Sequence, residues 1–297
     1  MPAHPRRLEE SYRALAVPTG SPRYWSWLFA AAPMRGPLLG IYALLAEWRA
    51  LMDPALELAA AHLKLAWWRE EIERLAHGTP VHPITRYIAS LPRAGARAGE
   101  VDFTPLEKTL EAAARQIGGA PLERGAELET HAAALWAEPL AIAARLGGEP
   151  SGAAQGIATP APAVAAAVHR AEAALAAAEY LNDAIASYRR AARFGRVAFP
   201  VDELLAANIE DADLCAEEPP LHLQSYLEEL RRRVVRYCSQ SSADLPRSEH
   251  APMRHLLVLA ALGARQASGG DARRNGLRPL RQLYLAWSTA RRAAGRQ

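Results

Sequence analysis

The stretch LAWWREEIERLAHGTPVHPITR, residues 65–86, carries the strongest fold signal in the chain. Its first part has the spacing of an amphipathic helix, which we predict at residues 55–77. The expected apolar side of this helix is formed by Leu63, Trp67, Ile72 and Leu75. Residues 78–80 then favour a turn. A second helix is expected to begin at Pro83, with His82 either capping it or packing against it. The stretch therefore predicts two helices joined by a turn, with Trp67 and Trp68 serving as core residues.

Helical spacing continues along nearly the whole chain, and no run of alternating strands appears. Ala, Leu, Arg and Glu dominate while β-branched residues are sparse, which favours helix over strand. We expect one all-α domain at residues 20–294, preceded by an N-terminal extension at 1–19, with the best linker candidate at 147–162. Breaks are expected at Pro33 and Pro37, among other turn residues. The predicted helices span residues 21–31, 37–52, 55–77, 83–91, 104–117, 122–146, 161–193, 222–240, 250–267 and 277–294.

Composition limits the functional classes that remain. The 297 residues are 50% hydrophobic and 23% charged, enough for a substantial core, and the formal net charge is only +3. Basic residues are spread between acidic ones, so the composition does not point to a nucleic-acid partner. Cys215 and Cys238 lack metal-ligand spacing, so a reduced, cytoplasmic protein is expected. No secretory signal or spanning apolar run is visible, which leaves a peripheral membrane contact open.

Three sequence blocks carry a resemblance to a known family. IYALLAEWR (41–49), the block 65–86 and GRVAFPVDEL (195–204) occur in that order. They resemble the YAxxxxxR, WWRDEL…G…HPVTR and GRVYLPxDEL blocks of the squalene/phytoene synthase family. The resemblance covers residues 20–294. It implies the all-α isoprenoid-synthase fold, a single helical bundle with a central cavity.

The resemblance also implies a chemistry. Active members of that family join two prenyl diphosphates head to head, with two aspartate-rich motifs on facing helices holding Mg²⁺. Aspartates four residues apart share one helix face and suit a hard cation, which stabilises the leaving diphosphate. Register from Tyr42 places the first pair at positions 52 and 56, and register from Gly195 places the second at 187 and 191. The residues there are Met52, Leu56, Ser187 and Ala191.

Four displaced acids offer an alternative magnesium clamp: Asp53, Glu57, Glu179 and Asp183. Each pair is four residues apart. The competing interpretation is structural. Asp53 then caps a helix that begins at Pro54, and Glu57 stabilises its first turn. Glu179 and Asp183 then form ion pairs with arginines such as Arg189 or Arg190, or stay solvated.

Arginines could hold a diphosphate without a metal, through bidentate contacts. The residues assigned to this role are Arg49, Arg189 and Arg196. Arg49 matches a family position that faces the substrate cavity, whereas a solvent-facing position is the competing interpretation for Arg189, Arg190 and Arg193. The histidines are scattered and have no metal-ligand spacing.

A subgroup of the family shows similar losses. The stretch at 46–70 and the ending PLRQLYLAWSTARR (279–292) are similar to the mitochondrial complex I assembly factor with a phytoene-synthase-like domain and to its bacterial relatives. We therefore predict a non-catalytic member that binds an isoprenoid or other lipid or acts in assembly through a protein partner, with no cofactor. The alternatives are an active, Mg²⁺-dependent prenyl-diphosphate transferase that uses the displaced acids and a purely structural protein with a filled cavity.

Overall fold

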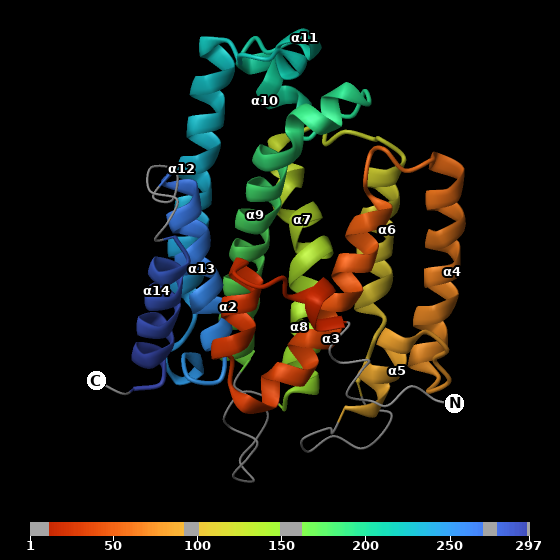
Figure 1. Cartoon of the computed structure of the whole chain (residues 1–297), viewed down its shortest axis with the longest axis vertical. Helices are drawn as coiled ribbons and strands as arrows, with labels where there is room; N and C mark the ends of the chain where they lie inside the picture. Colours follow the sequence, from red (N-terminus) through yellow and green to blue (C-terminus); the bar gives the residue numbers. More distant parts are fainter. Residues whose placement is uncertain (1–11, 92–100, 149–161, 270–277, 296–297) are drawn as a thin grey trace.

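The computed structural model describes residues 12–91, 101–148, 162–269 and 278–295, and these contain helices and no strand. The all-α, single-domain prediction is confirmed (Figure 1). The linker predicted at 147–162 lies largely outside the described residues. The α-helices are α2 (Pro22–Phe29), α3 (Ala32–Leu51), α4 (Leu58–Ala76), α5 (Pro83–Ser90), α6 (Pro105–Ile117), α7 (Leu128–Ala132), α8 (Glu138–Leu146), α9 (Pro162–Arg193), α10 (Val201–Ala206), α11 (Asp211–Cys215), α12 (Leu221–Asp244), α13 (Arg254–Ala267) and α14 (Arg278–Ala293).

Helix α9 forms the centre of the bundle. It packs against α7, α12 and α13, as Figure 1 shows, and its 32 residues are rich in alanine. Ala171, Ala177 and Ala178 are almost completely buried, because a methyl side chain lets neighbouring helices approach closely. Before α2, Ala16 and Val17 also lie in the core, although they belong to the stretch expected as an N-terminal extension.

The joint between α4 and α5 is organised by one buried carboxylate. Glu71 accepts hydrogen bonds from the backbone N–H groups of Val81 (2.9 Å) and His82 (2.8 Å), and from the Thr85 hydroxyl. Arg74 Nε donates to its other oxygen at 2.8 Å. Burial alone would raise the pKa of Glu71, but these hydrogen bonds outweigh it and lower the pKa. The turn between the two helices is thus fixed by an acid from the WWREE block.

His82 has both predicted roles. It is the N-cap of α5, where its Nδ1 accepts from the Ile84 N–H at 3.2 Å, and its ring lies 4.7 Å from the Trp68 ring. The predicted apolar side of α4 is wrong in part, because Leu63 is 75% exposed and Trp67 is 38% exposed. At 3.6 residues per turn, Leu63 lies about 180° from Ile72, so the two cannot share a face. The buried face is Ala61, Leu65, Trp68, Glu71, Ile72 and Leu75.

The helix predicted at 122–146 is divided into several parts. A short 3₁₀ turn, η1 (Gly125–Glu127), leads into α7, and the π-helical segment η2 (Ala133–Ala137) joins α7 to α8. Pro139 has no N–H to donate to the carbonyl four residues earlier, which favours a wider turn at this point. The Thr109 hydroxyl donates to the nearby Ala134 carbonyl at 2.7 Å. The wide turn contains Leu135 and Trp136, which line a cavity between this segment, α3 and α9.

Three further local predictions need correction. Pro33 and Pro37 do not break the chain, because Pro33 lies in the first turn of α3 and the helix continues through Pro37. A Cβ at Gly40 would lie 2.7 Å from Ile88 Cγ1, so this glycine allows α5 to pack closely on α3. Asp53 does not cap α4, which begins at Leu58; its Oδ1 instead accepts from the Ala55 N–H at 2.9 Å within the preceding turn. The short helix α11 was not among the predicted helices.

Candidate functional site

A cavity of about 520 Å³ lies between α3, the η2 segment and α9. Its apolar wall includes Leu15, Leu135, Trp136, Ala184, Ala191 and Val197. Four arginines also line it: Arg23, Arg49, Arg190 and Arg196. Among the described residues, two carboxylates line it, Asp53 and Asp183. Cations therefore outnumber anions on the described wall of this cavity, which favours an anionic group beside an apolar one.

Two reciprocal ion pairs join the end of α3 to α9. Arg49 Nη1 lies 2.7 Å from Asp183 Oδ2, and Arg190 Nη2 lies 2.8 Å from both oxygens of Asp53. Each side of the cavity thus supplies one cation and one anion. The side chains of the two pairs are between 34% and 58% exposed, so water reaches them. The pairs occupy the two aspartates that line the cavity.

The remaining cavity arginines are bound differently. Within the described chain, neither Arg23 nor Arg196 has a carboxylate at ion-pair distance. The Arg23 guanidinium lies 4.3 Å from the centre of the Trp136 ring, and Arg196 Nη1 donates to the Gln116 carbonyl at 3.5 Å. Guanidinium groups in this situation keep donors for a carboxylate or phosphate.

Two uncharged polar side chains extend the cavity wall. Burial lowers the pKa of His131 to about 4, so its ring is neutral at pH 7, and it makes an edge contact with Tyr180 at 5.5 Å. Gln116 also lines the cavity, and its Oε1 atom is buried with no hydrogen-bond partner among the described residues. A buried amide oxygen normally has a partner, so Gln116 marks a place for a polar contact with a bound molecule.

The four displaced acids do not converge. Asp53 and Asp183 line the cavity, each paired with an arginine, but neither Glu57 nor Glu179 is among its lining residues. Glu57 is exposed at the N-cap position of α4. Glu179 is partly buried, and desolvation raises its pKa to about 7, although Arg23 and Arg49 act in the opposite direction. The pairing expected for Asp183 is wrong in its partner, which is Arg49.

The arginine predictions have mixed outcomes. Arg49 and Arg196 line the cavity, whereas Arg189 lies outside the lining and donates to the Tyr188 hydroxyl at 3.1 Å. Arg190, expected to face solvent, lines the cavity and binds Asp53. Sequence reasoning missed Arg23, which lies before the first family block and belongs to no motif. It also missed the π-helical turn that places Trp136, for which the Glu138-Pro139 pair was the available signal.

The side chains at this site do not fit a magnesium clamp. Met52 and Ser187 line the cavity, and the Ser187 hydroxyl donates to the Asp183 carbonyl at 2.7 Å. Leu56 is not among the lining residues. Two residues four apart that do line the cavity at the end of α3 are Arg49 and Asp53. Across the described residues, no group of three or more His, Cys, Asp and Glu side chains is placed to hold a metal ion. A cation that prefers several oxygen ligands would meet guanidinium groups here.

The comparisons with known proteins agree with this fold. The family model for squalene/phytoene synthase matches residues 17–289. This chain belongs to the squalene/phytoene synthase family. A dehydrosqualene synthase crystallised with a ligand is similar in structure, with a TM-score of 0.69, 12% identity and coverage of 96% of each chain. The squalene synthase HpnC from Alicyclobacillus acidocaldarius has a TM-score of 0.63 and 17% identity, with coverage of 96% of this chain and 97% of its own. A search of curated protein sequences finds no match.

At these identities the solved structures establish the fold of this family member and leave its activity open. No described helix is both long enough and apolar enough to span a bilayer.

Proposed function

We propose that this member of the squalene/phytoene synthase family binds an isoprenoid or similar lipid with an anionic head group and does not ionise it with Mg²⁺. One observation carries the proposal: both aspartates on the cavity wall are already paired with arginines from the facing side. In an active clamp, acids on facing helices need a metal between them. Here Arg49 and Arg190 supply the opposite charge directly, and the helices are held together without a cation.

The cavity has features suited to such a ligand. A volume of about 520 Å³ falls within the range of small-molecule sites, and its apolar wall suits a hydrocarbon chain. Arg23 and Arg196 would bind the head group, because neither has a carboxylate partner in the described structure. The protein would bind its ligand without converting it and would act through a protein partner, as the likeness to the assembly-factor subgroup suggests.

Calorimetric titration with farnesyl diphosphate, with and without Mg²⁺, tests the proposal, alongside an assay for released pyrophosphate. We expect binding in the absence of Mg²⁺ and no pyrophosphate. Arg196→Met should weaken binding about tenfold, since charge-assisted contacts contribute roughly 1.5–3 kcal/mol. Arg193→Met is the matched control, because Arg193 is exposed on the same segment and lies outside the cavity lining.

Two results would contradict the proposal. Mg²⁺-dependent pyrophosphate release that Asp53→Asn or Asp183→Asn abolishes would establish the alternative, an active prenyl-diphosphate transferase with displaced carboxylates. An absence of binding by any isoprenoid, together with lipid-free protein in mass spectrometry of extracts, would indicate a structural protein. A co-purified isoprenoid that is lost from the Arg196→Met variant would support the binding function.

A further inference from the structure

Helix α14 presents large apolar side chains to solvent. Leu280 is 62% exposed, Tyr284 68% and Trp287 43%, and Leu283 lies beside them at 36%. Their spacing of three and four residues places them on one face of the helix. The neighbouring face, with Ala286 and Ala290, packs on α13 and α2. An exposed stripe of this kind marks an interaction surface more often than chance exposure does.

The same side of the bundle is strongly basic. Helices α2, α13 and α14 pack on one another, and α2 also contacts α3 (Figure 1). The described residues in 12–46, 250–269 and 278–295 contain no Asp or Glu. Besides Arg23, which lines the cavity between α3 and α9, they contain eight arginines: Arg13, Arg35, Arg254, Arg265, Arg278, Arg281, Arg291 and Arg292. Because the whole chain has a net charge of only +3, this side differs sharply from the rest of the protein.

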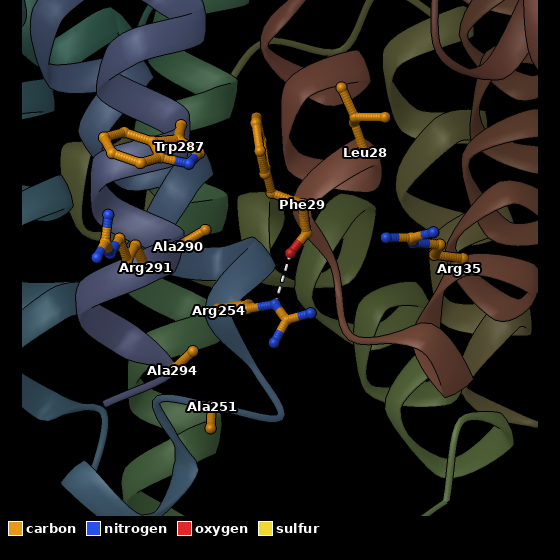
Figure 2. Close-up of a pocket in the computed structure, with 9 residues that line it drawn as sticks. All are labelled: Leu28, Phe29, Arg35, Ala251, Arg254, Trp287, Ala290, Arg291 and Ala294. Atoms are coloured by element: carbon orange, nitrogen blue, oxygen red, sulfur yellow. Dashed lines mark hydrogen bonds between the residues drawn. The ribbon is translucent and has the colours of Figure 1, made fainter. Parts of the chain in front are cut away.

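A groove of about 630 Å³ lies where α14 meets α2 (Figure 2). Arg35, Arg254 and Arg291 line it together with Phe29 and Trp287, and no carboxylate is among its described lining. Arg254 is held in place by donating to the Phe29 carbonyl at 2.6 Å and to the Ala30 carbonyl at 3.1 Å. The groove therefore combines fixed positive charge with aromatic surface, next to the exposed stripe.

We infer that this side of α14, defined by Leu280, Leu283, Tyr284, Trp287 and Arg291 with the adjoining groove, docks on the surface of an anionic phospholipid bilayer. Tryptophan and tyrosine favour the membrane interface, leucines enter the acyl boundary, and arginines bind lipid phosphates. Nucleic acid would leave the leucines in water. A second copy of the chain would bring like charges together, because Arg281, Arg291 and Arg292 of one molecule would meet those of the other.

This inference is independent of the function proposed for the cavity. It concerns side chains outside the cavity lining, and a bilayer contact neither requires nor excludes a bound isoprenoid. It also needs no spanning segment, since the contact is made by one face of a helix that lies on the surface.

Vesicle sedimentation tests it with the full-length protein. We expect sedimentation with vesicles of phosphatidylcholine and phosphatidylglycerol, little with phosphatidylcholine alone, and a loss of binding as salt is raised. Arg291→Gln with Arg292→Gln should weaken partitioning about tenfold or more, because each basic residue near an anionic surface contributes about 1 kcal/mol. Tyr284→Ser with Trp287→Ser should weaken partitioning by at least as much, because it removes the inserted aromatic surface.

Leu221→Ser with Arg231→Gln is the matched control. It removes one exposed leucine and one arginine from α12, and Leu221, which is 80% exposed, lies at the end of α12 near α11, far from α14 (Figure 1). This control should bind like the wild type, with all variants keeping the wild-type circular dichroism spectrum and melting temperature. Equal binding to both vesicle types, equal loss in the control, or no effect of the α14 variants would overturn the inference. A dimer that forms through this face, detected by light scattering, would also overturn it. So would an acidic protein that displaces the vesicles from this face.

Discussion

Two groups of carboxylates in this protein have opposite roles. Glu71 lies between α4 and α5 and accepts four hydrogen bonds from one arginine, one hydroxyl and two backbone N–H groups. Asp53 and Asp183 lie on the cavity wall, where each is bound by a single partly exposed arginine. The first site is buried and fully supplied with donors. The second site is open to water. Its two described carboxylates are each paired with an arginine, so they do not suit a metal ion.

The difference shows which part of the family framework this chain retains. The acid of the WWREE block holds a turn in place, so its loss would be felt throughout the fold. At the cavity, Asp53 and Asp183 instead pair with arginines, and these two ion pairs link the end of α3 to α9 without a metal ion. The fold therefore has its cavity although Met52, Leu56, Ser187 and Ala191 supply no carboxylate.

The largest expected effect is at the buried acid. Glu71→Ala leaves the Val81 and His82 N–H groups and the Arg74 guanidinium without their acceptor, at a cost of about 3 kcal/mol in the free energy of unfolding. Urea denaturation measures the change. Glu70→Ala, one residue away with a side chain 66% exposed, should leave the unfolding midpoint nearly unchanged. Equal effects of the two variants would mean that Glu71 does not organise the joint.

The lowered pKa of Glu71 also predicts how its contribution to stability depends on pH. Because the folded protein lowers that pKa, the stabilisation from Glu71 is present above the pKa of the unfolded chain and is lost as pH falls through the folded-state value. The difference between wild type and Glu71→Gln should therefore shrink in acid. A difference that grows below pH 4 would contradict the hydrogen-bonding account.

Restoring acids at the cavity should restore a cation site. Arg49→Asp with Ser187→Asp adds two carboxylates beside Asp53 and Asp183 and removes one competing guanidinium. We expect Mg²⁺ at about ten times its dissociation constant to stabilise this variant by about 1.4 kcal/mol in thermal unfolding, and to leave the wild type unchanged. Ala186→Asp with Arg189→Asp makes the same charge change outside the cavity lining of α9. Equal stabilisation of that control would show non-specific binding.

Much of the fold follows from local sequence patterns. The apolar spacing of α9 and α12, the turn at residues 78–80 and the cap at His82 place most helices within a few residues of their observed ends. The family assignment follows from three short blocks. These signals work because helix period, turn residues and caps are all properties of neighbouring residues.

The cavity was harder to predict because it depends on how separate helices face one another. Arg190 binds an aspartate 137 residues away, and Arg23 reaches Trp136 from α2; neither pairing has a local pattern. The buried side of α4 is set by its contacts with α5 and α6, and the prediction grouped Leu63 with Ile72 and Leu75 although it lies on the exposed face. The π-helical turn at Ala133–Ala137 is a local widening of the helix that the apolar spacing of residues 122–146 did not predict.

A third carboxylate has a raised pKa, in contrast to the lowered pKa of Glu71. Glu172 on α9 is 3% exposed, and burial raises its pKa to about 8, which Arg145 offsets only in part. A raised acid pKa means that the folded state keeps a proton the unfolded chain releases, so stability falls as pH rises from about 4.5 to about 8. Glu172→Gln should therefore gain stability relative to wild type at pH 9, by about 1 kcal/mol, and little at pH 4. Thermal unfolding at the two pH values measures the gain, with the exposed Glu111→Gln as control.

The smallest effect is expected at the cavity ion pairs themselves. Arg190 and Asp53 are 58% and 41% exposed, so a double-mutant cycle with Arg190→Met and Asp53→Asn should give a coupling energy of only about 0.5 kcal/mol. The coupling should fall further in high salt, because exposed charges are screened. A parallel cycle on Arg49 and Asp183, at 45% and 34%, should give a slightly larger value. If either coupling matched the cost of losing Glu71, the pairs would be structural supports of the same rank. A weak coupling would instead show that the pairs neutralise the two aspartates without being needed for the stability of the fold.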